Sequence, residues 1–119
     1  MKDILLVDDE ASFLMSLADG LKSIYGKQCN VFTAQNGRIA VEMLKTVIVD
    51  IVVTDLRMPE MDGFELISYL KKHHTDISVI VMTAFSDRNI DSLMRNHRVK
   101  HVAEKPIDLK DIANRIMAA

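Results

Sequence analysis

Three short runs of mainly apolar residues constrain the fold of this chain most strongly. They are Ile4–Val7, Ile51–Val53 and Ile77–Met82, and an Asp or Thr closely follows each of them. A strand that is apolar on both faces is typical of a parallel sheet covered by helices on each side. The runs therefore predict buried parallel strands whose ends carry polar side chains.

The segments between these runs have the spacing of amphipathic helices or of shorter strands. Helical spacing predicts helices over 11–25, 39–45, 62–70, 87–95 and 108–117, and further strands are expected over 29–34 and 99–103. Strands and helices thus alternate in the order βαβαβαβαβα. With right-handed crossovers, this order favours an α/β fold with a doubly wound five-stranded parallel sheet of strand order 2-1-3-4-5. Ligands bind such sheets at the carboxyl ends of the strands.

The composition fits one soluble domain, and we expect residues 1–119 to form it with no output domain in this chain. Such a domain either works alone through partner binding or is part of a longer regulator. The chain is 49% hydrophobic and 27% charged, with a net charge of −2 and no basic stripe, which argues against direct nucleic-acid binding. Cys29 is the one cysteine, so no internal disulfide forms and a reducing compartment is favoured. The longest apolar run, 47–53, contains Asp50 and is too short to span a membrane. We expect a cytoplasmic protein that is not membrane-bound.

Polar residues gather where the predicted strands end. The residues are Asp8, Asp9, Asp55, Thr83 and Lys105. Taken singly, Asp8, Asp9 and Thr83 fit helix caps, Asp55 fits a turn and Lys105 fits a solvated surface. Because parallel strands end at one edge of the sheet, we expect all five to share one rim.

Three carboxylates at one rim indicate a bound cation. Two unit charges at about 4 Å repel by about 1 to 4 kcal/mol under surface-like conditions. Oxygen ligands without nearby His or Cys suit Mg²⁺, or Mn²⁺ in its place, rather than zinc. A divalent cation, a lysine, a hydroxyl and a carboxylate nucleophile are the groups that phosphoryl transfer to aspartate requires.

Four motifs in order make the chain resemble the receiver domains of two-component response regulators along its whole length. They are Leu5–Glu10, Val53–Gly63, Val81–Ala84 and Lys105–Pro106. The resemblance implies the flavodoxin-like (βα)₅ fold of the chemotaxis regulators. It also implies a signalling phosphoacceptor that catalyses only its own phosphoryl transfer and slow dephosphorylation, and is not otherwise an enzyme.

The resemblance implies a role for each residue of the rim. Asp55 corresponds to the phosphoacceptor, and Thr83 and Lys105 to the groups that contact the phosphoryl oxygens. The implied Mg²⁺ ligands are Asp9, Asp55 and the backbone carbonyl of Arg57, with Asp8 acting largely through water. The phosphodonor would be a histidine kinase or a histidine phosphotransfer protein, and the phosphorylated domain would act on a downstream output domain or target protein.

The chain departs from the family at its switch position. Receivers typically carry a Tyr or Phe three residues before the lysine, and here that residue is Val102. A β-branched side chain is stiff and has little lever arm. We therefore expect activation to move the segment 84–93 instead of an aromatic ring. The family also predicts a cis bond between Lys105 and Pro106, and we expect bulky Phe85 to slow hydrolysis of the acyl phosphate.

Three other functions fit the sequence less well. A phosphohydrolase of the haloacid dehalogenase type needs a second Asp two residues after its nucleophile, where this chain has Arg57. A flavin or nucleotide binder needs a phosphate loop after the first strand, where Asp8, Asp9 and Glu10 would repel a phosphate. A binding module that works without phosphorylation would not require the complete rim.

Two further features have simpler interpretations. His73, His74, His97 and His101 fit solvated surface positions better than metal ligands. The apolar segment Val47–Val49 lies where a polar loop is expected, so it either packs under the second helix or forms an exposed contact.

Overall fold

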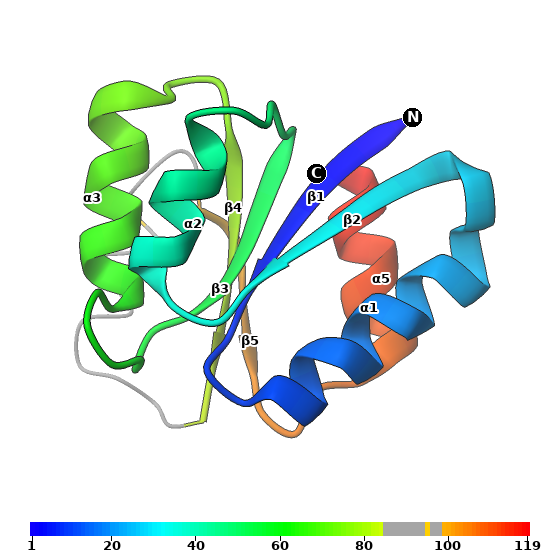
Figure 1. The fold of residues 1–119 in the computed structure, drawn as a ribbon. Coiled ribbons are helices and arrows are strands. Elements are labelled where there is room, and N and C mark those ends of the chain that lie inside the picture. Colours follow the sequence, from blue (N-terminus) through cyan, green and yellow to red (C-terminus); the bar gives the residue numbers. More distant parts are fainter. Residues whose placement is uncertain (85–94, 96–98) are drawn as a thin grey trace.

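The computed structural model describes residues 1–84, 95 and 99–119 (Figure 1). The helix predicted over 87–95 lies outside these residues, except for Arg95. The described elements are β1 (Lys2–Val7), α1 (Ala11–Tyr25), the 3-10 turn η1 (Gly26–Gln28), β2 (Cys29–Ala34), α2 (Gly37–Leu44), β3 (Ile51–Asp55), α3 (Gly63–His73), β4 (Ser78–Thr83), β5 (Val99–Glu104) and α5 (Leu109–Ala118).

The strands form one five-stranded parallel sheet in the order β2-β1-β3-β4-β5, which confirms the predicted topology. Strand β1 pairs with β2 on one side and with β3 on the other, so the direction of winding reverses there. In a doubly wound sheet this reversal opens a crevice at the carboxyl ends of the two strands. We call that side of the sheet the carboxyl-end edge, and the opposite side the amino-end edge.

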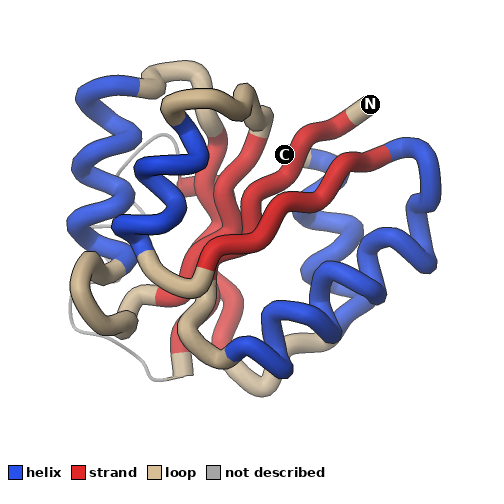
Figure 2. Tube along the Cα trace, viewed as in Figure 1, coloured by secondary structure: helices blue, strands red, loops and turns tan. Residues whose placement is uncertain are grey.

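Helices cover both faces of the sheet. Helices α1 and α5 lie on one face and α2 and α3 on the other (Figures 1 and 2). Alternate residues of β1 serve the two layers: Ile4 and Leu6 pack toward α1 and α5, while Leu5 and Val7 pack toward α2 and α3. Each of these side chains is at most 1% exposed, and full burial of such a side chain contributes about 1.5–3 kcal/mol. The continuous apolar run is thus the consequence of two cores.

Polar side chains set the starts of three helices. Asn36 accepts the backbone N–H of Ile39 at 2.9 Å and caps α2, so the helix begins at Gly37 rather than at Ile39 as the spacing predicts. Asp62 and Glu65 form a capping box at the start of α3. Asp108 caps α5 by accepting the N–H of Asp111 at 3.0 Å. These caps satisfy N–H groups that have no partner within the helix.

The segment Val47–Val49 is partly packed under helix α2 and partly exposed, so each of the two predicted outcomes holds for some of its residues. Val49 is buried and Val47 packs against the core beneath α2, while Ile48 is 89% exposed. Cys29 is a buried core residue, as expected. Among the helices that the structure describes, none combines the length and the apolar character that crossing a membrane requires.

At the amino-end edge, polar groups pair individually. The backbone N–H of Asp3 donates to the Asp50 carboxylate at 2.8 Å, and the Asn30 amide donates to the Asp3 carboxylate at 2.9 Å. The Lys2 ammonium donates to the carbonyls of Ile116, Met117 and Ala119 at the end of α5. A cation at a helix carboxyl terminus is favourable because the last carbonyls carry partial negative charge.

Candidate functional site

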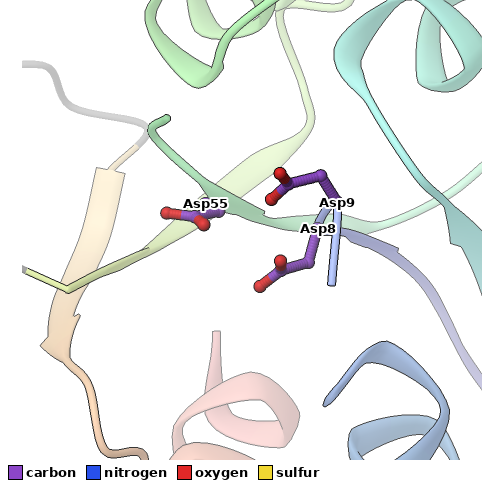
Figure 3. A group of neighbouring side chains, drawn as sticks. All are labelled: Asp8, Asp9 and Asp55. Atoms are coloured by element: carbon purple, nitrogen blue, oxygen red, sulfur yellow. The ribbon is translucent and has the colours of Figure 1, made fainter. Parts of the chain in front are cut away.

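The five predicted rim residues come together at the carboxyl-end edge. Asp8 and Asp9 follow β1, Asp55 and Thr83 are the last residues of β3 and β4, and Lys105 follows β5. Figure 3 shows Asp8, Asp9 and Asp55 beside one another. Their ligand oxygens all lie within 4.8 Å of one another. Parallel strand order alone therefore explains why residues so far apart in the sequence meet.

Burial differs among the three carboxylates. Asp8 is fully buried, Asp55 is 7% exposed, and Asp9 is exposed at the mouth of the site. A buried carboxylate is costly unless hydrogen bonds or positive charge compensate it. Asp8 meets this condition with two donors: the backbone N–H of Glu10 at 2.9 Å and the Lys105 ammonium at 2.9 Å. The N-cap residue of helix α1 is Glu10, not Asp8 or Asp9, and the Glu10 side chain makes no capping hydrogen bond.

Asp55 is fixed by its own backbone neighbours. The N–H of Leu56 donates to Asp55 Oδ1 at 2.7 Å, which leaves Oδ2 facing Lys105 at 3.3 Å. The Thr54 hydroxyl donates to the Asp55 carbonyl at 2.8 Å. Gly63 lies against the same carbonyl, and a Cβ at this position would be 2.2 Å from that oxygen. A glycine is therefore required where α3 begins.

Lys105 is held above the carboxylates by backbone and side-chain contacts. Its backbone N–H donates to the Thr83 carbonyl at 2.7 Å, and its bond to Pro106 is cis, as the family resemblance predicted. The ammonium contacts Asp8 at 2.9 Å, Asp55 at 3.3 Å and Glu10 at 3.5 Å, and the side chain is only 14% exposed. One ammonium thus serves three carboxylates.

The pKa values of Asp55 and Lys105 are both raised. Burial raises the pKa of Asp55; the Lys105 charge opposes this rise and the negative charge of Asp8 adds to it. Burial lowers the pKa of Lys105, but the hydrogen bonds and negative charges of Asp8 and Asp55 together outweigh burial, so this pKa is also raised. Both groups hold a proton more strongly than usual, Asp55 chiefly because it is buried and Lys105 because carboxylates contact it.

The remaining predicted residues have different surroundings. Thr83 is buried at the end of β4. Arg57 is exposed in the loop after β3, with its guanidinium 5.3 Å from the centre of the Phe64 ring. Val102 is half-buried and packs against the core under α2 and α3. Phe85 and the rest of the predicted switch segment, apart from the exposed Ala84, lie outside the described residues, so those expectations stay predictions.

Two contacts of Lys105 were not anticipated from the sequence. The sequence indicates Glu10 as an acid that repels phosphate and Phe13 as an apolar residue of the first helix; in the structure both approach the ammonium. The available signal was their position at the start of a helix that follows an acidic strand end, with Glu10 just before α1 and Phe13 in its first turn. Among the described residues, the one cluster of His, Cys, Asp or Glu with metal-binding spacing is Asp8, Asp9 and Asp55.

The histidines occupy different surroundings. His73 and His74 lie beside the Tyr69 ring, at 4.6 and 5.6 Å between centroids. His101 is half-buried rather than fully solvated, and burial, followed by the nearby charge of Arg115, lowers its pKa. His97 lies outside the described residues.

Comparisons with known proteins agree with the site. Regulatory protein AtoC of Escherichia coli is 37% identical over 86 residues, which cover 71% of this chain and 18% of AtoC. The DNA-binding transcriptional regulator NtrC of Escherichia coli is 32% identical over 106 residues, 89% of this chain and 22% of NtrC. The chain thus spans about a fifth of the length of these curated relatives.

A solved structure and a family model complete the comparison. Response regulator protein TrrA from Thermotoga maritima, solved in complex with Mg²⁺ and a beryllium fluoride, is 25% identical, with a TM-score of 0.83 over 99% of this chain and 98% of that one. The family model described as response regulator receiver domain matches residues 4–117. This chain belongs to the response regulator receiver domains, the phosphoacceptor family of two-component signalling.

Proposed function

We propose that this receiver accepts a phosphoryl group on Asp55. One observation carries the assignment: Asp55 is a buried carboxylate grouped with two other acids and a lysine, with one oxygen fixed by a backbone N–H and the other facing the ammonium. A nucleophile held in this way has its orientation set before the donor arrives. Asp8 is fully buried and holds Lys105 more closely, at 2.9 Å against 3.3 Å for Asp55, and Asp9 lies at the exposed mouth.

The donor set fits Mg²⁺. Three carboxylates with oxygens within 4.8 Å of one another supply oxygen ligands only, and the Lys105 ammonium contacts two of them. We propose Asp9, Asp55 and the Arg57 carbonyl as direct ligands, with Asp8 acting largely through water; Mn²⁺ can substitute. When bound, the ion supplies positive charge that neutralises the phosphoryl oxygens.

The transfer step uses Asp55 Oδ2, the oxygen that faces the Lys105 ammonium. Asp55 Oδ2 attacks phosphorus and forms a new P–O bond, while the bond from phosphorus to the donor nitrogen or oxygen breaks and the donor leaves with the electron pair. Lys105 then donates to a phosphoryl oxygen, since its ammonium already lies 3.3 Å from Oδ2. The Thr83 hydroxyl, at the end of the neighbouring strand β4, supplies a further donor to the phosphoryl group.

The proposed partners are a histidine kinase or histidine phosphotransfer protein as donor, and an output domain or target protein downstream. AtoC and NtrC are named as regulators, which supports a regulatory output. The free, buried thiol of Cys29 is consistent with a reducing cytoplasm. We propose no catalysis on other substrates.

Acetyl phosphate tests the assignment without a partner protein. With Mg²⁺, mass spectrometry should show one added phosphoryl group that is labile in base, and chelation should abolish it. Asp55→Asn keeps the shape but removes the nucleophile, so labelling should be lost. Asp50→Asn, at the opposite edge, is the matched control and should label normally. Labelling of the Asp55→Asn protein at another residue would refute the assignment.

A further inference from the structure

The ring of Phe13 lies over the Lys105 ammonium. The distance from Lys105 Nζ to the ring centroid is 4.7 Å, within the range of an energetically significant cation–π contact. Phe13 is the third residue of α1, and it packs against the core between α1 and α5. That packing restrains the ring, and the contact joins α1 to the loop between β5 and α5.

The ring differs in kind from the other neighbours of the ammonium. An ammonium has three N–H donors, and three carboxylates lie within 3.5 Å of this one. An aromatic face attracts the positive charge without requiring an N–H. A phosphoryl oxygen must replace a carboxylate as the partner of one N–H, but it need not displace the ring.

The three carboxylates are unequal anchors. Asp8 is fully buried and holds the ammonium at 2.9 Å, whereas the Glu10 side chain is 65% exposed and its ion pair is screened by water. Asp55 is the group that changes when it accepts the phosphoryl group. Asp8 and Phe13 are therefore the two anchors that persist through the reaction, one charged and one neutral.

We propose that Phe13 is a positioning residue for phosphoryl acceptance: its ring holds the Lys105 ammonium over the pocket while that ammonium exchanges a carboxylate for a phosphoryl oxygen. The inference rests on the proposed function of Asp55. It adds a neutral, aromatic contribution that strengthens binding of the phosphoryl group without adding negative charge beside it.

A series of fluorinated phenylalanines at position 13 tests the proposal, because fluorine removes electron density from the ring face with little change in shape. The probe is beryllium fluoride with Mg²⁺, which mimics the phosphoryl group without a partner protein. Its affinity should fall steadily from mono- to trifluorophenylalanine, reaching about a 2- to 5-fold loss. Phe13→Leu should show the same loss, whereas Phe13→Trp, which keeps an aromatic ring, should bind beryllium fluoride as well as the parent protein does. Trifluorophenylalanine in place of Phe32, which packs against the core beneath α2 and α3, is the control and should bind normally.

A second measurement tests the contact without any phosphoryl chemistry. The Hε protons of Lys105 should be shifted upfield by the ring current of Phe13 in NMR spectra, and Phe13→Leu should abolish that shift. A flat fluorination series with normal binding by the parent protein would overturn the positioning role and leave Asp55 as acceptor. If the parent protein neither binds beryllium fluoride nor labels with acetyl phosphate, the proposed function fails, and the positioning role fails with it.

Discussion

The two edges of the sheet treat their charged residues differently. At the amino-end edge, the Asp50 carboxylate accepts a hydrogen bond from a backbone N–H, and the Asp3 carboxylate accepts one from a side-chain amide. The Lys2 ammonium donates to carbonyls at the end of α5. At the carboxyl-end edge, three carboxylates share the ammonium of Lys105. The first edge has a donor for each acceptor, while the second is short of positive charge.

This difference separates stabilising from functional use of charge. Polar groups that join strands and helices work best when each has its own partner. A site that must receive a cation and an anionic group keeps carboxylates whose charge the protein itself does not fully compensate, at some cost in stability. The carboxyl-end edge is therefore where substitutions should change chemistry most, and the amino-end edge where they should change only folding.

The same substitution of a lysine at each edge should produce the largest difference in effect. Lys105→Met should slow labelling by acetyl phosphate about 100-fold or more, because a preorganised donor to the phosphoryl group is lost. Lys2→Met should leave the labelling rate unchanged and cost about 0.3–1 kcal/mol of stability, the value of a cation at a helix carboxyl terminus. Quenched time courses of labelling measure the rate, and urea unfolding measures the stability. Equal losses of labelling in both variants would contradict the distinction.

Mg²⁺ should stabilise the protein through one edge only. At a free concentration 100 times its Kd, a ligand that binds only the folded state adds about 2.7 kcal/mol. Calorimetry should therefore show Mg²⁺ raising the unfolding temperature of the parent protein. Asp9→Asn should reduce the rise, and Asp3→Asn should retain it. If Asp3→Asn and Asp9→Asn respond to Mg²⁺ alike, the ion binds elsewhere.

Removing the charge of Asp55 should stabilise the metal-free protein. Its pKa is raised by burial, so the folded state holds the proton more strongly than the unfolded state, and stability is lost as pH rises through the folded pKa. Asp55→Asn should therefore gain on the order of 1 kcal/mol at neutral pH. The gain should shrink with acidification and vanish below the ordinary carboxyl pKa of 3.8. Urea unfolding with chelator across this pH range measures it, and a gain that persists at acid pH would show a cause other than charge.

The topology could be predicted from the sequence because the apolar runs are local signals of burial on two faces. Once Ile4–Val7 and Ile51–Val53 are parallel strands, the meeting of Asp8 and Asp55 follows from geometry alone. The start of α2 was misplaced because Asn36 and Gly37 fit a turn as well as a helix cap. The split at Val47–Val49 depends on packing beneath α2, which periodicity does not record.

The contacts around Lys105 were less accessible to sequence reasoning. Convergence at one edge predicts that Lys105 lies near Asp55, but not that Phe13 covers its ammonium. That contact depends on the direction in which α1 leaves the sheet and on the path of the chain after β5. Both are set by helix packing between α1 and α5, which is a long-range property.

The contact between Gly63 and Asp55 has a mechanical consequence. The Gly63 N–H donates to the Leu56 carbonyl at 2.9 Å, and only hydrogen atoms separate the Gly63 α-carbon from the backbone of Asp55 and Leu56. No side chain stands between them to change rotamer and absorb a displacement. The end of strand β3 and the first turn of α3 are therefore in direct backbone contact. A shift in the main chain of Asp55 should displace the start of that helix as well.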